Sequence, residues 1–506
     1  MTRYSTGILI IALFSFYTCS KEVKETPRLS IKIPENNIIA KVRDKIITVN
    51  EFIKRAEYTV RPAYCRGDNN IHKKIILNSL IGEKLLSLEA IDISLSPHLV
   101  RYLKGRKEQA MRELLFYEKG QKDIQISPEI LDSFSSTAAR KYRVIFSRLP
   151  DQMIADEIHH FMDQGISYEE IFDAAFGLDS IPERSIDFFS EVDPHIVDKI
   201  FSVNLEKDEV LPPFKIIDGS YLWIKIKGWT KMPAITATAK NVFLQDIDKK
   251  LNRLEAIRKY NEYTTELMAG KKMDLIEPAF LRFSDIASTY YLGHINDNKL
   301  IEAIWNIHEE IDEKPDFSSM ESYERETPLM YFDERTWSVG EIQELIESHP
   351  LVFRKKKIKK NEFPEQLKYA LADLIRDHYL TAEAYKMGYD KQHSVLLEKY
   401  LWEDHLYASL KKDQVLKEKG SSTENDEDNL NVMNDYIGML QKKYSGQIII
   451  NFRQFNKINL SHIDMVALKP SAPYGHLVPS FPILTQDHSI DYGKDIHYLQ
   501  SNDNNQ

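Results

Sequence analysis

The segment IIAKVRDKIITVNE, residues 38–51, decides the fold expected for the N-terminal part of this chain. Its apolar residues form two short runs, Ile38–Val42 and Ile46–Ile47, and the polar residues Arg43–Lys45 between them predict a turn, so the segment predicts a β-hairpin. Thr48 and Glu51 then have the spacing of a capping box, in which a hydroxyl and a carboxylate satisfy free amides at a helix start. A helix is therefore expected from Glu51.

The same pattern recurs far downstream, where Ser338 and Glu341 form a second capping box after Thr336-Trp337. Each copy is followed by a helical pattern with the same internal spacing: Leu77, Leu80, Ile81, Leu86, Glu89 and Ala90 in the first, and Leu371, Leu374, Ile375, Leu380, Glu383 and Ala384 in the second. A chance match of two amphipathic helices is the alternative, because such helices all repeat leucine at steps of three and four. The shared boxes favour a duplicated module over residues 38–96 and 331–390.

A different unit is expected between the two copies, over residues 140–229. Its patterns predict strands at Tyr142–Phe146, Val210–Lys215 and Tyr221–Lys227, and helices at Met153–Gln164 and from Tyr168. Such a mixture indicates an α+β domain. Beyond it, the apolar face Phe243, Ile247, Leu251, Leu254 and Ile257 predicts a long helix that bridges domains.

Composition limits the classes of function. With 506 residues the chain is too long for one hydrophobic core, so several domains are expected. Its net charge of −10 provides no global positive field for phosphates, which argues against nucleic acid as a partner. No Gly-x-x-x-x-Gly-Lys nucleotide loop occurs, and neither do the His-Glu-x-x-His, Cys-x-x-Cys or Gly-x-Ser-x-Gly motifs. We therefore expect no nucleotide, metal or other cofactor.

The N-terminus predicts export. Arg3 precedes an apolar run, Gly7–Tyr17, that is too short for a membrane-spanning helix but suits a signal peptide. Cys19 follows this run as in a lipobox, although Phe16 and Thr18 stand where Leu and a small residue are usual. The alternatives are lipidation at Cys19 and a plain secretory signal with an incidental cysteine.

Three other features have simpler readings. Cys65 is expected to be a packed thiol, because no basic partner that would activate it is evident. His159 and His160 point about 100° apart on a helix, so they are expected to be solvated or half-buried and not to bind a metal. The basic run 354–360 could touch acidic clients or anionic lipid, but a solvated loop is the simpler interpretation.

The pattern from Ile39-Ala40-Lys41-Val42 to Glu51-Phe52, with Leu77, Leu80, Ile81 and Glu89-Ala90, resembles the N-terminal chaperone domain of the SurA and PrsA group of extracytoplasmic folding factors. The middle unit resembles a parvulin domain in Phe201-Ser202, Pro212-Pro213-Phe214 and Asp218-Gly219-Ser220-Tyr221 to Ile224-Lys225-Ile226. The resemblance covers about two thirds of the chain. It implies an ATP-independent chaperone with a peptidyl-prolyl isomerase-like domain.

Active parvulins use two histidines on adjacent inner strands. The resemblance places Arg143 at the first-strand histidine and Leu222 at the last-strand histidine, and the usual glycine-rich segment is absent between Gly177 and Phe201. These departures imply a degenerate site without catalytic residues.

The expected fold is a multidomain, predominantly α-helical chain with an α+β parvulin-like domain and a duplicated SurA N-terminal-like helical module. Its expected parts are a signal peptide (1–18), a tether (19–36), the first module (37–136), the parvulin-like domain (137–232), a long helix with a connecting segment (233–330), the second module (331–415), a C-terminal segment (416–467) and an extended or disordered tail (468–506).

The expected function is that of a chaperone in the periplasm, lipid-anchored to a bacterial outer membrane, with unfolded or nascent exported proteins and outer-membrane proteins as partners. One alternative is an active parvulin-type prolyl isomerase. A second is a structural envelope lipoprotein that serves as a scaffold.

Overall fold

The computed structural model of the chain describes residues 33–177, 182–217, 219–231, 237–296, 322–355, 357–420, 426–460 and 478–496. The fold is mostly helical, at about 60%, with three small sheets. The expected signal peptide and Cys19 lie outside the described residues. No described helix is both long enough and apolar enough to cross a membrane.

The first module begins with the predicted hairpin. Its elements are β1 (Ile38–Val42), β2 (Lys45–Thr48), α1 (Val49–Glu57) and α2 (Asn70–Glu89). Arg43 adopts a left-handed backbone (φ 56°) in the turn between the strands. Thr48 caps α1 by accepting a hydrogen bond from the Glu51 amide at 3.0 Å. The predicted box is only half formed, because the Glu51 carboxylate pairs with Lys84 at 2.8 Å instead of returning to the cap.

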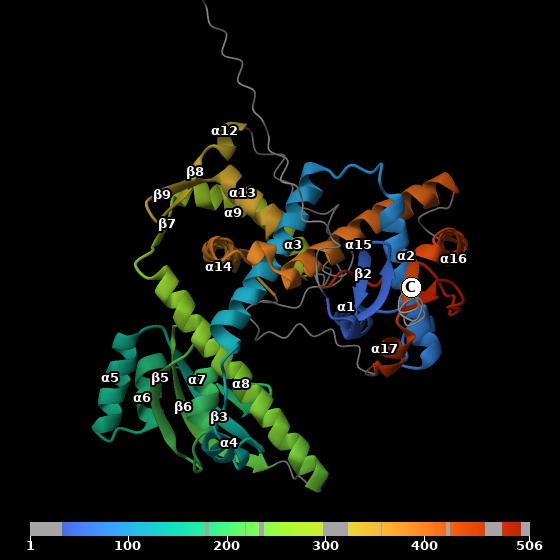
Figure 1. Cartoon of the computed structure of the whole chain (residues 1–506). Coiled ribbons are helices and arrows are strands. Elements are labelled where there is room, and N and C mark those ends of the chain that lie inside the picture. Colours follow the sequence, from blue (N-terminus) through green and yellow to red (C-terminus); the bar gives the residue numbers. More distant parts are fainter. Residues whose placement is uncertain are drawn as a thin grey trace, which may run out of the picture.

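The C-terminal part of the chain completes this module. Its elements are α15 (His393–Glu418), α16 (Asp426–Lys443), β10 (Ile448–Ile450), α17 (Phe452–Lys457) and β11 (Lys494–Asp495). They join one sheet in the order β11-β10-β1-β2, with β10 antiparallel to β1. One apolar core combines α1 and α2 with Met433, Ile437 and Phe455. Figure 1 shows these blue and red segments side by side.

The second module is built on a separate, three-stranded sheet in the order β7-β8-β9. Its elements are β7 (Met273–Leu275), α9 (Glu277–Asn296), α12 (Ser322–Arg325), β8 (Pro328–Phe332), β9 (Arg335–Ser338), α13 (Val339–Ser348) and α14 (Phe363–Lys386). Its core centres on Trp337, Ile342, Phe363 and Leu371. In this copy the capping box of Ser338 and Glu341 is complete.

The two hairpins share one register. Ile38 pairs with Thr48 and Ala40 with Ile47, while Pro328 pairs with Ser338 and Met330 with Trp337. The residue numbers of equivalent positions differ by 290 throughout. The irregularity in the ladder also falls at the same place, between Ile38 and Ala40 and between Pro328 and Met330. In both copies a third strand from a distant segment pairs antiparallel with the first hairpin strand. The two hairpins are therefore equivalent in pairing as well as in sequence pattern.

The middle unit, here called the sheet domain, is α+β. Its elements are α4 (Pro128–Ser135), β3 (Arg140–Leu149), α5 (Gln152–Asp163), α6 (Tyr168–Phe176), β4 (Glu183–Asp187), α7 (Pro194–Phe201), β5 (Val210–Lys215) and β6 (Tyr221–Lys231). The sheet is antiparallel in the order β4-β3-β6-β5, so its first and last strands are the two inner ones. One face packs with α7 and the long helix α8 (Ala237–Met268) around Phe201, and the other packs with α5 and α6 around Trp223.

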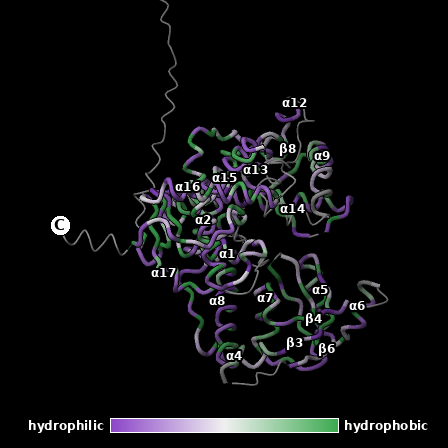
Figure 2. Tube along the Cα trace, turned by 90° about the vertical axis from the view of Figure 1, so that its right-hand side faces the viewer, coloured by the Kyte–Doolittle hydropathy of each residue, from purple (hydrophilic) through white to green (hydrophobic). Residues whose placement is uncertain are grey.

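Two long helices connect the parts. Along α3 (Pro97–Phe116), Leu103 packs on Trp402 of α15, and Met111 packs near Ala384 of α14. Along α8 (Ala237–Met268), Leu251 joins the core of the sheet domain and Tyr260 packs with α3 and α14. The long helix thus bridges domains as expected. Figures 1 and 2 both show the sheet domain set below the two helical modules, with α8 running past it.

Short helical turns complete the described chain. They are η2 (Glu35–Asn37), η3 (Ala63–Cys65), η4 (Tyr117–Gln121), η5 (Lys360–Glu362), η6 (Tyr389–Lys391) and η7 (Ser445–Gln447). Of these, η4 is a π-helical turn that extends α3 and packs against α8, where Gly120 faces Ala256 and Tyr260.

The expected tail partly belongs to the folded body. Residues 478–496 are extended, but Val478, Phe481 and Leu484 are buried, and β11 pairs with β10. The expected connecting segment is also structural, because β7 and α9 help to form the second module. Neither contribution was foreseen from local sequence patterns.

Candidate functional site

The structure does not bring together the two positions that the sequence singled out in the sheet domain. Arg143 lies on β3 opposite Gly228, whereas Leu222 lies on β6 opposite Arg148, five residues farther along β3. Arg143 is exposed and pairs with Glu183 of β4 at 3.5 Å. Leu222 is buried in the core on the α7 side. These two residues therefore form no common site.

The buried side chains of the two inner strands include no group that is suited to acid–base chemistry near neutral pH. Neither β3 nor β6 contains a histidine, and the domain's His159 and His160 are exposed on α5. The hydroxyl oxygens of Ser147 and Tyr168 lie 3.3 Å apart, between the sheet and α6. Burial raises the pKa of the Tyr168 phenol to about 12, so this phenol stays protonated. This geometry supports packing and supplies no base.

Among the apolar side chains that the sheet domain exposes, three lie on two loops near the start of α7. Phe189, Val192 and Ile217, here called the apolar patch, are 37%, 38% and 45% exposed. Phe189 also packs edge-on against Phe188 and Phe243, with ring centroids 5.2 and 5.6 Å apart. The patch is therefore continuous with the domain core.

Asp193 holds the two loops of the patch together. One of its carboxylate oxygens accepts hydrogen bonds from the amides of His195 and Ile196 at the start of α7, at 2.8 and 3.4 Å. The other accepts from the amide of Ile217 at 2.8 Å. A buried carboxylate that is shared in this way fixes both loops, because its loss would leave amides without acceptors.

Lys250 of α8 fixes the first of these loops from the other side. Its ammonium donates to the backbone carbonyls of Phe189 and Glu191, at 3.3 and 2.5 Å. Burial, together with the nearby Arg253, lowers the pKa of Lys250. The apolar patch is thus presented on loops that charged side chains hold to the helix and the sheet.

A group of buried, interacting charged side chains lies between α1, α2 and α15 of the first module. Glu83 accepts hydrogen bonds from both terminal nitrogens of Arg55, at 2.9 and 2.8 Å, and its Oε1 lies 2.5 Å from Nδ1 of His405. Arg55 also donates to the carbonyl of Ser480 at 2.6 Å. Burial alone would raise the pKa of Glu83, but Arg55 and His405 outweigh it and lower the pKa to about 2.

A second buried group of charges adjoins the first. Lys84 lies 2.8 Å from Glu51 and 3.2 Å from Asp404, and Lys45 lies 2.6 Å from Asp404. Although burial lowers the pKa of Lys84, the carboxylates of Glu51 and Asp404 raise it above its usual value. We call the two groups together the charged interface. They tie α15 to the hairpin module.

A hollow of about 240 Å³ opens beside the charged interface. Its walls include Thr48, Glu51, Lys84, Glu398, Leu401 and Asp404. Because Lys84 and Lys45 already neutralise the nearest carboxylates, the hollow offers no free cluster for a cation. Within the described residues, no group of three or more His, Cys, Asp or Glu side chains could hold a metal ion.

Cys65 lies in the same module and is fully buried. Burial raises the pKa of its thiol to about 12, so the thiol stays protonated and unreactive. This agrees with the packed thiol expected from the sequence.

Compared with models of known protein families and with curated proteins, the chain has no significant match. Sequence reasoning missed both the apolar patch and the charged interface. The available signals were the charged pair Glu83-Lys84 between apolar residues of α2, and Asp193-Pro194 after the exposed Phe189.

Proposed function

We propose that this protein is an ATP-independent chaperone of exported proteins, in which a parvulin-like sheet domain binds clients without isomerising them. It would act in the bacterial periplasm, anchored by a lipid on Cys19. The observation that carries the proposal is the apolar patch, a fixed and exposed apolar surface on a domain whose inner strands lack catalytic groups.

The domain organisation supports the proposed relationship to the SurA and PrsA group. That resemblance calls for a sheet in which the first and last strands are adjacent and internal, and β3 and β6 have this arrangement. It also calls for a short hairpin followed by a capped helix, and the chain has two such hairpins with the same register.

The chemistry of the patch suits weak and unselective binding. Full burial of one client side chain contributes about 1.5–3 kcal/mol. A few exposed side chains such as Phe189, Val192 and Ile217 would therefore hold an unfolded segment without trapping it. Backbone fixed by Asp193 and Lys250 lowers the entropic cost of binding, because the loops are already ordered.

The geometry disfavours an active isomerase. Strong catalysis requires groups that stabilise a twisted amide, but Arg143 points to solvent beside Glu183 and Leu222 lies in the core. The barrier to uncatalysed rotation is about 18–20 kcal/mol, and neither residue supplies a polar group placed to lower it.

The proposal is tested by the suppression of client aggregation, measured by light scattering after an unfolded outer-membrane protein is diluted from urea. The triple variant F189S, V192S, I217S should lose most of the activity of the full chain. The matched control I91S, I130S, M153S removes three other exposed apolar side chains, which are 84%, 46% and 75% exposed, and should keep it. Equal losses in both triples would refute the patch as the client site.

A further inference from the structure

A loop of the second module concentrates positive charge in an otherwise acidic chain. The loop lies between α13 and α14, and six of the seven residues from 354 to 360 are Arg or Lys, whereas the whole chain has a net charge of −10. In the first module the corresponding loop, residues 58–69, has only Arg61 and Arg66 as basic residues. The second module therefore has a strongly basic loop that the first module lacks.

The loop is anchored by its apolar residues. Leu351 and Ile358 are buried, and Phe353 packs against Tyr291 and Phe363 with ring centroids 5.1 and 5.6 Å apart. These contacts hold the basic side chains at a fixed place on the surface, against α9 and α14.

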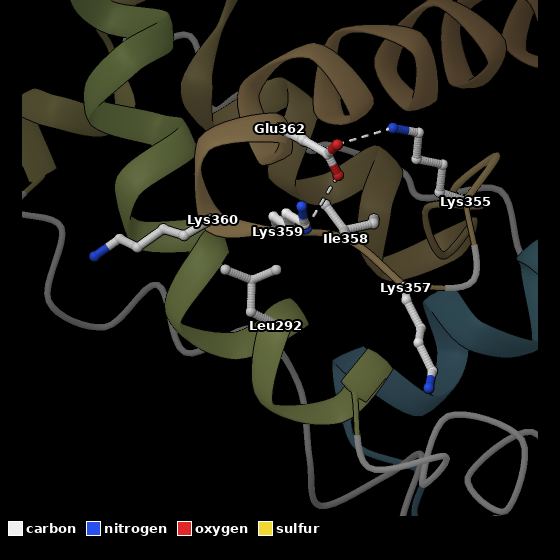
Figure 3. A pocket seen from close by; sticks show the side chains of 7 residues that line it. All are labelled: Leu292, Lys355, Lys357, Ile358, Lys359, Lys360 and Glu362. Atoms are coloured by element: carbon white, nitrogen blue, oxygen red, sulfur yellow. Dashed lines mark hydrogen bonds and ion pairs between the residues drawn. The ribbon is translucent and has the colours of Figure 1, made fainter. Parts of the chain in front are cut away.

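Only part of the positive charge is neutralised within the protein. Arg354 pairs with Asp373 at 3.3 Å, and Lys355 pairs with Glu362 at 3.1 Å. Within the described part of the chain, Lys357, Lys359 and Lys360 have no ion pair, and all three are exposed. Figure 3 shows Lys357 and Lys360 extending away from Glu362 in different directions.

A broad hollow lies among these side chains, with a volume of about 740 Å³. It is lined by Leu292, Lys355, Lys357, Ile358, Lys359, Lys360 and Glu362. In the same loop, Val352 is 76% exposed, although its neighbour Leu351 is buried. The loop thus presents unpaired ammonium groups around a hollow, together with one projecting apolar side chain.

We propose that this basic loop binds the anionic head groups of a lipid bilayer surface. Free lysines attract an array of negative head groups, and an exposed valine can enter the interfacial layer beside them. A single acidic peptide is a poorer fit, because the side chains of Lys357 and Lys360 extend in different directions. The proposal does not depend on the client-binding function.

The test is flotation of the full chain with vesicles, in the C19A background so that no acyl anchor contributes. Vesicles of phosphatidylcholine with about one third phosphatidylglycerol should bind the protein, and vesicles of phosphatidylcholine alone should not. Binding should weaken as NaCl rises from about 0.05 to 0.5 M, because salt screens exposed charges. The triple variant K357Q, K359Q, K360Q should lose roughly a hundred-fold in apparent affinity.

The matched control is K199Q, K207Q, K215Q, which removes three exposed lysines from the sheet domain. It should bind within about two-fold of the parent, since the bulk field changes equally in both triples. Equal losses in the two triples would overturn the assignment to the loop. Absence of a preference for anionic vesicles, or displacement of the protein from them by polyglutamate at matched charge, would overturn the assignment to lipid. Circular dichroism of both triples checks that each remains folded.

Discussion

Glu83 binds Arg55 through both of its carboxylate oxygens, and neither side chain is exposed to solvent. Because α1 contributes the cation and α2 the anion, this pair holds the hairpin module together. His405 and the carbonyl of Ser480 extend the same network to α15 and to the C-terminal segment. A local pair therefore fixes segments that are more than 300 residues apart in the chain.

Glu83→Gln should destabilise the protein by about 3–5 kcal/mol, because it leaves a buried guanidinium without its counter-charge. Denaturant unfolding would measure the change. The control Glu118→Gln removes the partly exposed pair with Lys122 and should cost under about 1 kcal/mol. Similar decreases in the free energy of unfolding for the two variants would show that the buried pair contributes no more to stability than an exposed one.

The stability of the chain should depend on the ionisation of Glu113. Burial, reinforced by the carboxylate of Glu398, raises the pKa of Glu113 to about 7, and Lys54 offsets only part of this. The folded state therefore holds the proton more tightly than the unfolded state, and this contribution to stability is lost as the pH rises from about 4.5 through 7. Glu113→Gln should be more stable than the parent at pH 8, and the gain should disappear near pH 4. A gain that is independent of pH would contradict the assignment.

Gly105 should be essential for the docking of the second module on α3. A Cβ atom at this position would lie 1.8 Å from the carbonyl oxygen of Ser348 at the end of α13. Gly105→Ala should therefore cost about 1–3 kcal/mol through overpacking. Gly438→Ala in α16, where a Cβ meets nothing within 4 Å, should be neutral or stabilising by up to about 1 kcal/mol. Thermal unfolding of both variants checks the difference, which should vanish if α3 and α13 are not in contact.

Membrane attachment tests the expected lipid anchor. Cys19→Ala should move the mature protein from the membrane fraction to the soluble fraction at high salt, because an acyl chain contributes about 0.8 kcal/mol for each buried CH₂ group. High salt is needed because the basic loop would otherwise retain part of the protein. Unchanged attachment of the variant at high salt would contradict acylation at Cys19.

The local elements could be predicted from the sequence because their signals lie within a few residues. The hairpin at Ile38–Thr48, the cap at Ser338 and the helix that ends before Gly165 all follow from spacing and turn chemistry. Gly165 adopts a left-handed backbone (φ 79°), which explains the stop.

The long-range pairings could not be predicted in this way. The sequence of the run Ile448–Ile450 does not indicate that β1 is its partner, because any short apolar strand can pair with any other. Likewise, Glu51 fits a capping box, but the buried Lys84 of α2 attracts its carboxylate. The resemblance pairs Arg143 with Leu222 in one site, and only the strand register shows that they are five residues apart along the ladder.

The most direct test of the account is a pair of assays on the full chain, a proline-limited refolding reaction and the suppression of client aggregation. We expect suppression of aggregation with little or no acceleration of the proline-limited phase, because the sheet domain offers an apolar surface without an imidazole pair. Acceleration of that phase by ten-fold would correspond to about 1.4 kcal/mol off the barrier. Acceleration of this size, abolished by substitutions at Arg143 or its neighbours on β3 and β6, would contradict the account and identify an enzyme.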